Sequence, residues 1–529
     1  MEALYARGPE GAQLVNISGV GSMGFTRLAI NGLNAAGMQP MADEDRTWMC
    51  NGEIYNWRAL AEEYGITTRS GSDCEILGEL YEKFYECGMS LGSLFQALDG
   101  VFAIVLVDQA RQQVIIARDP YGVRPLFVTR DGCYAVASEM KALTPLTDNP
   151  DMPLEVFPPG HYQVIDYGDN TSYIREPVAY HTIPFLKNPL FVPDRVELAL
   201  MAVRQSLTAA VQKRMMTERP VAALLSGGLD SSLIAALVAK ELRAAGAPPL
   251  KTFSIGMKGS SDLLYAQKVA FWIGSDHTEI MLTADDFFNA VPEVIRAIES
   301  YDTTTVRASV GNWLVAKAVA KTDCKVVFNG DGSDEVWGSY LYFYNAPSPH
   351  AFEEESRRLL TDIHLFDVLR SDRSVSSHGL EPRTPYLDKE FVGVAQSVST
   401  LLRRPVQHTR CEKWLMRKAF DDGELLPSEV LWRRKEAFSD GVSGTEKSWY
   451  KIAQEKSLAA VGPRWREEAV KDGLDCPTTA EKYYYRKCFI EYFGAQNRYT
   501  TVPYLWMPRW SPGSKDPSAR TLGVYTSAT

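Results

Sequence analysis

The stretch AALLSGGLDSSLIAALVAK (residues 222–240) decides the fold of the second half of the chain. It joins a short apolar run to a longer apolar run with helical spacing through a loop of small residues, which predicts a strand, a turn and a helix. Gly227 and Gly228 allow the backbone to approach a ligand closely, and the first N–H groups of the helix point into the same space. Three hydroxyl groups add donors, those of Ser226, Ser231 and Ser232. We predict an anion site here, with a plain strand-to-helix turn as the alternative.

Length and composition indicate a globular protein of more than one domain. The 529 residues are 45% hydrophobic and 23% charged, and a chain of this length normally divides its core. The formal net charge of −10 argues against a broad nucleic-acid-binding face. The eight cysteines and seven histidines show no metal-site or disulfide spacing, and no signal peptide or membrane span is evident. We expect the cytosol, with neither nucleic acid nor membrane as a partner.

The sequence divides into four parts by its patterns. Residues 1–165 hold short β-branched and aromatic runs between turns, which predict packed sheets, with a helix over residues 74–87. Residues 166–195 have no clear period and form the predicted linker. Helical patterns alternate with short apolar strands over residues 196–510, which predicts a parallel sheet covered by helices. Residues 511–529 are small and polar, and we expect a poorly ordered tail.

The loop at residues 226–231 also lacks a residue that a common phosphate-binding loop has. GxxxxGK[ST] loops carry a lysine that reaches the terminal phosphates of ATP, and none is present here. The form SGGLDS instead resembles the ATP-pyrophosphatase superfamily, in which such a loop holds pyrophosphate while the α-phosphorus is attacked. This resemblance implies cleavage between the α- and β-phosphates and formation of an adenylate.

Motifs along the whole chain resemble those of glutamine-dependent asparagine synthetases, close to the animal type. The second part carries ESYDTTTVRAS (299–309), NGDGSDE (329–335), RTPYLD (383–388), WRRKEAFSDG (432–441) and DPSARTL (516–522). The first part carries RGPE, RLA, NGEIYN, GSDCE, LDGVFA, RDPYGVRPLF and ASEMKAL, in the order of that family. The resemblance implies an αββα N-terminal nucleophile glutaminase sandwich followed by an α/β ATP-pyrophosphatase domain. It also implies conversion of aspartate to asparagine with ATP and Mg²⁺, with glutamine or ammonia as the nitrogen source. A homodimer is compatible with this family.

The same resemblance assigns roles in the second domain. ATP and pyrophosphate would contact Leu225, Ser226, Gly227, Gly228, Asp230, Ser231, Ser232, Ile255, Asn329, Gly330 and Asp334. Asp230 and Asp334 would also hold Mg²⁺, since a carboxylate that attacks a polyanion needs cations to neutralise the developing charge. The catalytic set would be Asp331, Lys435 and Arg307, with Lys435 at the leaving pyrophosphate. Thr304 and Thr305 would contact aspartate or β-aspartyl-AMP.

Two positions depart from the pattern S-G-E-G-S-D-E that is common in this family. Asp331 stands where the family has a glutamate thought to help deprotonate the attacking ammonia, so its carboxylate lies one methylene further back. Proton transfer needs hydrogen-bond reach, directly or through one water, and we expect the shorter acid to work less well. Asn329 replaces a serine, which puts an ATP contact there in doubt.

The first domain retains the residues that would bind glutamine, but not the expected nucleophile. The binding residues are Arg27, Asn51, Gly52, Glu53 and Asp73. The family uses a cysteine that becomes residue one, whereas this sequence begins MEALYARGPE, and its nearest cysteine is Cys50. For the chain as written we expect synthesis from ammonia without glutaminase activity. Two explanations of the missing cysteine are open: the start codon is assigned too far downstream, or the protein relies on free ammonia. The retained glutamine-binding residues favour the first.

Two other functions fit parts of the sequence. A β-lactam-forming synthetase has a similar architecture and also lacks a working glutaminase, but the dense match around YDTTTVRAS and FSDG favours asparagine synthesis. A nucleotide-binding homologue without activity is the other alternative. It is disfavoured because Asp230, Asp334 and Lys435 are all present.

Overall fold

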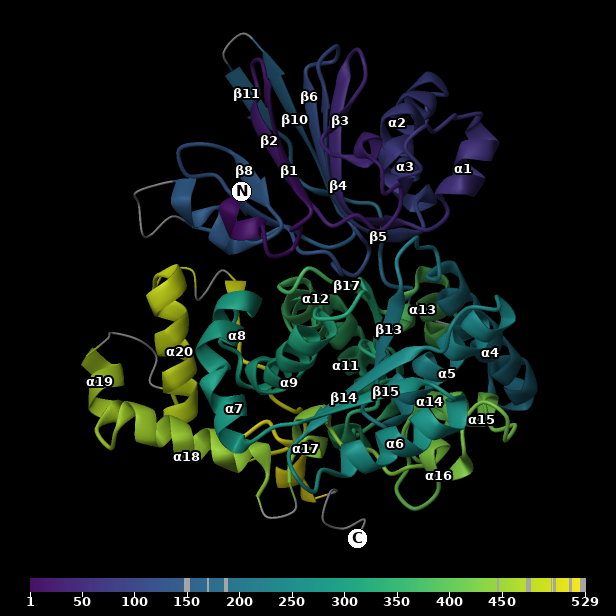
Figure 1. The fold of residues 1–529 in the computed structure, drawn as a ribbon, viewed down its shortest axis with the longest axis vertical. Coiled ribbons are helices and arrows are strands. Elements are labelled where there is room, and N and C mark those ends of the chain that lie inside the picture. The colour runs from purple at the N-terminus through teal and green to yellow at the C-terminus, as the bar shows by residue number, and fades with distance from the viewer. Residues whose placement is uncertain are drawn as a thin grey trace. The chain divides into compact units, whose positions relative to one another are not determined.

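The computed structural model describes residues 1–146, 153–168, 171–184, 189–444, 447–471, 477–495, 497, 501–512 and 516–523. The chain forms two compact units (Figure 1). Unit 1 consists of Met1–Ile183, Lys213–Pro220 and Ser376–Leu380. Unit 2 consists of Pro184–Gln212, Val221–Val375 and Glu381–Thr529. Each unit is therefore assembled from segments that are not continuous in the sequence.

The main sheet of unit 1 is antiparallel and is buried on both faces. Its strands are ordered β11-β10-β6-β5-β4-β3, and β12 also pairs with β10. Their bounds are β3 (Met41–Ala42), β4 (Arg46–Ile54), β5 (Gly100–Asp108), β6 (Gln113–Arg118), β10 (His161–Gly168), β11 (Thr171–Ile174) and β12 (Val178–Ala179). In β5, Phe102, Ile104 and Leu106 face one core, and Ala103 and Val105 face the other. Alternation between two apolar faces explains why this strand reads as a continuous apolar run.

Helices cover one face of that sheet, and smaller sheets cover the other. The helices are α1 (Trp57–Tyr64), α2 (Ile76–Glu86) and α3 (Leu91–Ala97), which lie together beside the sheet in Figure 1. The opposite face packs on β1 (Gly11–Ile17), β2 (Gly21–Arg27) and β8 (Ala135–Ala137), and β7 (Phe127–Thr129) pairs with β8 and with β9 (Glu155–Val156). The predicted sheet packing is confirmed, and the helix expected over residues 74–87 corresponds to α2.

Residues 166–195 were predicted to be a linker, but the structure shows that part of this segment belongs to the sheet of unit 1. Its first part contains β11 and β12, which extend the sheet of unit 1 by pairing with β10. These strands are too short to show a period in the sequence, but the ladder satisfies their backbone groups. The boundary between the units falls at Ile183, and residues 185–188 lie outside the described residues.

Unit 2 is built on a parallel sheet of five strands, as predicted. The strands are β13 (Val221–Leu224), β14 (Lys251–Gly256), β15 (Asp276–Met281), β16 (Val326–Phe328) and β17 (Glu381–Arg383). Their spatial order is β15-β14-β13-β16-β17, and every pair is parallel. The order reverses between β13 and β16, and in such sheets a crevice opens outside the carboxyl ends of the strands at that point.

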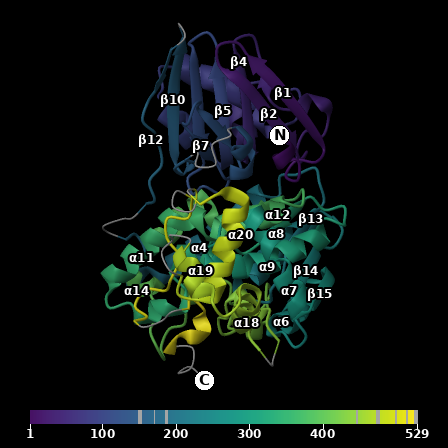
Figure 2. The same ribbon diagram turned by 90° about the vertical axis from the view of Figure 1, so that its left-hand side faces the viewer.

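Four helices begin at the crevice: α5 (Leu229–Ala244), α6 (Ser261–Ile273), α9 (Thr303–Val319) and α10 (Ser333–Trp337). The other helices of the unit are α4 (Val196–Lys213), which ends in unit 1, α7 (Ala284–Asn289), α8 (Val291–Ile298), α11 (Pro349–Asp362), α12 (Asp367–Ser376), α13 (Lys389–Gln396), α14 (Thr400–Arg403), α15 (Trp414–Ala419), α16 (Ser428–Leu431), α17 (Phe438–Gly441), α18 (Trp449–Val461), α19 (Trp465–Lys471) and α20 (Ala480–Phe493). The yellow helices α18 to α20 pack together (Figure 2). None of the described helices combines the length and apolarity that crossing a membrane requires.

The C-terminal tail, residues 511–529, was expected to be poorly ordered, but its described residues 516–523 make defined contacts with unit 2. Asp516 accepts hydrogen bonds from Arg307 Nη1 and Nη2 at 2.9 and 2.7 Å, and Leu522 is buried in an aromatic core cluster. These contacts hold residues 516–523 against unit 2, although the segment itself is small and polar. Residues 513–515 and 524–529 lie outside the described residues.

Candidate active site

A cavity of about 240 Å³ opens at the carboxyl ends of β13 and β16. Two loops form its floor, residues 225–228 after β13 and residues 329–332 after β16. At Gly330 a Cβ atom would lie 2.7 Å from the Ser231 nitrogen, so only a glycine allows the second loop to approach the first turn of α5 this closely. The crevice of the sheet is thus a real cavity lined by both predicted motifs.

The SGGLDS loop has the backbone geometry of an anion site. Gly227 has a φ of +69°, and a Cβ atom there would lie 2.5 Å from the Ala266 nitrogen. The Ser226 N–H donates to Ser231 Oγ at 3.1 Å, which closes the loop. Gly228 is the N-cap of α5 and has no side chain to accept from the first N–H groups of the helix. Those groups and the positive end of the helix dipole therefore remain available to a bound anion.

Most of the residues assigned to ATP line this one cavity. Those that do are Leu225, Ser226, Gly228, Asp230, Ser231, Ile255, Asn329, Gly330 and Asp334. Two assigned residues are not part of the lining. Gly227 turns the loop against α6, and the Ser232 side chain is fully buried on α5.

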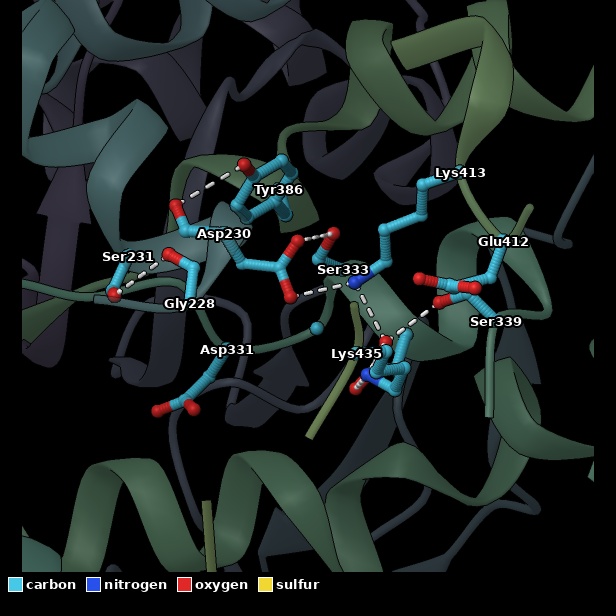
Figure 3. A network of polar contacts seen from close by, with 12 residues as sticks. Gly228, Asp230, Ser231, Asp331, Ser333, Ser339, Tyr386, Glu412, Lys413 and Lys435 are labelled. Atoms are coloured by element: carbon cyan, nitrogen blue, oxygen red, sulfur yellow. Dashed lines mark hydrogen bonds and ion pairs between the residues drawn. The ribbon is translucent and has the colours of Figure 1, made fainter. Parts of the chain in front are cut away.

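Two carboxylates and two lysines form the polar centre of the cavity (Figure 3). Lys413 Nζ lies 2.6 Å from Asp230 Oδ2 and 2.6 Å from Asp334 Oδ1. Lys435 Nζ lies 2.6 Å from both carboxylate oxygens of Asp334. Burial opposes ionisation of Asp334, but the two lysines outweigh it and hold the pKa of that carboxyl well below its usual range. The two negative and two positive charges of this centre therefore balance. A bound polyanion could pair with the lysines, and its cation could pair with the carboxylates.

Lys413 was missed by the sequence analysis. Its side chain is only 2% exposed. Burial lowers the pKa of Lys413, but the charges of Asp230 and Asp334 outweigh burial and raise the pKa above its usual value. The residue has a φ of +56° at the N-cap of α15, which directs it inward. In the sequence it is one lysine in a run with other basic residues, TRCEKWLMRK, and no spacing distinguishes it from surface lysines.

Asp331 lines the same cavity and is held by an arginine. Arg370 Nη2 donates to Asp331 Oδ1 at 2.8 Å and also pairs with Asp367. Asp331 Oδ2 is buried and has no hydrogen-bond partner among the described residues. Burial raises the pKa of Asp331, Arg370 counteracts this, and the charge of Asp367 raises it again. Arg370 thus fixes one oxygen of Asp331, and a hydrogen bond from Ser371 also helps to lower the pKa of this carboxyl.

Asn329 holds the turn in which Asp331 lies. Its Nδ2 donates to Ser371 Oγ at 2.7 Å, and its Oδ1 accepts from the Asp331 N–H at 3.2 Å. The residue is 3% exposed. Its amide is therefore occupied by the protein at a position where the family commonly has a hydroxyl.

The two threonines predicted to contact aspartate lie at the start of α9, at the wall of the cavity. Thr305 donates from its N–H and its Oγ1 to Asp302 Oδ2, both at 2.8 Å, which caps the helix. Thr304 Oγ1 is buried without a hydrogen-bond partner among the described residues. An unpartnered buried hydroxyl at the cavity is available to a substrate.

Arg307 lies elsewhere than the sequence analysis expected. It does not belong to the cavity lining, and its side chain is 3% exposed. Its guanidinium makes paired hydrogen bonds with Glu481 at 2.7 and 2.5 Å and with Asp516 at 2.9 and 2.7 Å. Two bidentate carboxylates occupy its donors, so the structure gives Arg307 a role in fixing α9 against α20 rather than a free guanidinium in the cavity.

The residues expected to bind glutamine lie in unit 1 around the end of β4. Asp73 Oδ2 accepts from the Ile54 N–H at 2.6 Å, Glu53 Oε2 accepts from Asn31 Nδ2 at 2.6 Å, and Asn51 donates to Ser138. Gly52 has a φ of +154°, and a Cβ atom there would lie 1.9 Å from the Val101 oxygen. Arg27 Nη1 donates to the Asn34 oxygen at 2.8 Å, beside the turn that contains Gly32. The structure thus brings the end of β4 together with Asp73, and Arg27 contacts the turn at Gly32, next to the Glu53 partner Asn31.

Two cysteines beside these residues are buried. Cys50 and Cys74 are 1% and 2% exposed. A hydrogen bond with Cys50 and burial raise the pKa of Cys74 well above its usual value. A buried, protonated thiol is a poor nucleophile. Neither geometry nor charge therefore supports Cys74 as an internal replacement for the nucleophile of the family.

Comparison with known proteins assigns both parts of the chain. Residues 202–353 and 345–497 match the asparagine synthase family, and residues 1–167 match the glutamine amidotransferase domain family. Glutamine-hydrolysing asparagine synthetases of Cricetulus griseus and Homo sapiens are each 43% identical over 546 residues, and that of Gallus gallus is 42% identical over 548 residues. Each match covers 99% of this chain and 95% of the relative. The chain belongs to the glutamine-hydrolysing asparagine synthetase family.

Proposed function

We propose that this protein is an ATP-dependent carbon–nitrogen ligase that converts aspartate to asparagine through β-aspartyl-AMP. The observation that carries the proposal is the cavity itself, where an uncapped helix N-terminus faces a cluster of two carboxylates and two lysines. The loop at the helix suits the phosphates of ATP, and no lysine of a γ-phosphate site is present in it. Attack at the α-phosphorus fits these features.

In the first step an oxygen of the aspartate β-carboxylate forms a bond to the α-phosphorus, and the bond from that phosphorus to the bridging oxygen breaks. Pyrophosphate leaves with the electron pair. The Ser226–Ser231 loop would hold pyrophosphate, and Lys435, which is 11% exposed, would donate to it. Thr304 would bind aspartate or its adenylate, because its buried hydroxyl borders the cavity.

In the second step ammonia attacks the carbonyl carbon of the adenylate, AMP leaves, and the nitrogen gives up a proton. Asp331 would accept this proton through Oδ2, since Oδ1 is held by Arg370. Its raised pKa makes the carboxylate a stronger base than an exposed aspartate.

Asp230 and Asp334 fit a divalent cation. Their oxygens converge within 2.6 Å of one cationic group, the ammonium of Lys413, and carboxylate oxygens are the ligands that Mg²⁺ prefers. No set of three or more His, Cys, Asp or Glu residues in the described part of the chain forms a metal site alone, so phosphate oxygens would complete the ligands. Bound Mg²⁺ would neutralise charge on the leaving pyrophosphate.

We also propose that unit 1 binds glutamine through Arg27, Asn51 to Glu53 and Asp73, with glutamine or ammonia as nitrogen source. We further propose that the protein is located in the cytosol and forms a homodimer.

Nucleotide analysis after incubation with aspartate, ATP, Mg²⁺ and ammonium tests the main proposal. We expect aspartate-dependent formation of AMP and pyrophosphate. ADP with orthophosphate would refute adenylation, and an unchanged nucleotide would favour a homologue without activity.

A further inference from the structure

Lys435 lies on a short segment that has no regular secondary structure of its own. Residues 432–437 connect α16 to α17 and form neither helix nor strand. Such a segment is not fixed by a backbone ladder, so side-chain contacts must hold the lysine at Asp334. Two charged neighbours of Lys435 in this segment, Arg433 and Glu436, have partners on other elements.

Arg433, two residues before Lys435, is held by the first turns of α6. Its Nη2 donates to Asp262 Oδ1 at 2.9 Å and to Ser261 Oγ at 3.2 Å. Its guanidinium carbon lies 4.1 Å from the centre of the Tyr265 ring. The side chains of Arg433 and Asp262 are each 7% exposed. An ion pair shielded in this way fixes geometry better than an exposed pair, which solvent screens.

The helix that follows the segment, α17, packs against the same carboxylate. A Cβ atom at Gly441 would lie 2.2 Å from Asp262 Oδ2, so the carboxylate occupies the space that a side chain would fill. Ser260 Oγ donates to the Gly441 oxygen at 2.7 Å, and the Met257 N–H donates to the Val442 oxygen at 2.9 Å. The segment and the helix that follows it are therefore both fastened beside the start of α6.

We propose that Asp262 is a positioning residue for Lys435. Its carboxylate anchors Arg433 and thereby fixes residues 432–437, so that Lys435 faces the phosphate cavity. The importance of this placement for catalysis rests on the proposed function. The anchoring itself follows from contacts within the protein, although Asp262 and Arg433 also line the cavity.

The charges around Asp262 make this anchor sensitive to pH. Burial raises the pKa of Asp262 to about 7, while Arg433 and Arg520 lower it and Glu436 raises it. Asp440 is the fourth charged group nearby, and Arg520 donates both to Glu436 at 2.6 Å and to the Asp440 backbone oxygen at 3.0 Å. Above about pH 7 the Asp262 carboxylate is charged and holds Arg433. As the pH falls below that value, it takes up a proton and the ion pair is lost.

The first test measures the anchoring without any activity. Asp262→Asn removes the charge at nearly constant shape, and Glu429→Gln is the matched control, because Lys268 and Glu429 form an exposed ion pair at 2.6 Å between α6 and α16. At pH 8 we expect amide hydrogen exchange across residues 432–441 to be at least about tenfold faster in Asp262→Asn and unchanged in the control. Equal exchange in wild type and Asp262→Asn would overturn the proposal. Arg433→Met, which removes the guanidinium and its hydrogen bonds to Asp262 and Ser261, should behave like Asp262→Asn.

The second test uses aspartate-dependent exchange of pyrophosphate into ATP. The wild-type rate should fall as the pH drops below about 7, whereas Asp262→Asn should be slower by about tenfold at pH 8 and should lack the limb near pH 7, with the KM for aspartate nearly unchanged. An acid limb that keeps its midpoint near pH 7 in Asp262→Asn would overturn the positioning role, because the nearby Asp440, whose pKa burial raises to about 6, accounts only for a limb at lower pH. A wild type without any exchange would refute the proposed function instead, and the hydrogen-exchange result would then decide the anchoring.

Discussion

Lys435 donates hydrogen bonds to both carboxylate oxygens of Asp334, each at 2.6 Å, although 101 positions separate the two residues in the chain. Asp334 is also paired with Lys413, which in turn pairs with Asp230. In this arrangement each lysine is matched by a carboxylate before substrate binds, so the groups are preorganised and need little rearrangement. ATP with its cation can then enter by exchanging partners, the carboxylates toward the cation and the lysines toward the phosphates.

We expect Lys435→Ala and Asp230→Ala each to lower aspartate-dependent pyrophosphate exchange by about 100-fold or more, because each removes a charge that acts on the leaving group. The fold should remain, as judged by circular dichroism. Asp323→Ala is the matched control, since it breaks an exposed ion pair with Lys251 on the same unit. Normal exchange in either site variant would show that the active site lies elsewhere.

Asp331→Ala should slow asparagine formation by about 10- to 100-fold while it slows pyrophosphate exchange much less, because the carboxylate would act on ammonia after the adenylate has formed. The comparison of the two rates under the same conditions is the measurement. Asp331→Glu, which extends the carboxylate by one methylene, should be neutral or faster. Equal losses of both rates in Asp331→Ala would assign this residue to adenylation instead.

Local patterns predicted the fold and the loops of the cavity. The run AALL before the SGG loop and the repeated pairing of short strands with helices are enough to indicate a parallel sheet, and β13 to β17 form it. Contacts within one motif, such as Ser226 with Ser231, follow directly from the turn that the glycines allow. The strands β11 and β12 were not predicted, because strand pairing rather than sequence pattern stabilises such short segments.

The groups that connect distant parts of unit 2 could not be predicted from the residues. Lys413 lies 183 positions from Asp230, and nothing in its neighbourhood marks a buried lysine. Arg307 shows the opposite case, since the resemblance placed it at the substrate while Glu481, 174 positions away, holds it outside the cavity. Whether a charged side chain faces a ligand or a distant carboxylate depends on packing between elements, which spacing does not encode.

The stability of Asp262→Asn relative to wild type should depend on pH. The pKa of Asp262 rises from its usual 3.8 to about 7 in the fold, so the folded protein binds the proton more tightly than the unfolded chain. Raising the pH from about 4 to 7 therefore lowers the free energy of unfolding of wild type, by on the order of a few kcal/mol. Asparagine cannot ionise, so the Tm of the variant minus that of wild type should rise through this window and level off above it. Thermal unfolding at several pH values measures this, and a difference independent of pH would contradict the raised pKa.

Variants of the expected glutamine pocket should separate the two units functionally. Arg27→Ala and Asp73→Asn change residues of unit 1, whereas every residue that lines the ATP cavity belongs to unit 2. We expect each variant to weaken glutamine binding by about tenfold or more, because each removes a charge that could pair with the amino-acid head group. Synthesis of asparagine from ¹⁵N-labelled ammonium should remain within about twofold of wild type, since that reaction needs only the cavity of unit 2. Calorimetric titration with glutamine and mass spectrometry of asparagine give the two measurements, with the exposed residue Arg58 changed to alanine as the control. Undiminished glutamine binding would place the pocket elsewhere in unit 1, and a parallel loss of ammonium-dependent synthesis would show that this pocket also shapes the cavity of unit 2.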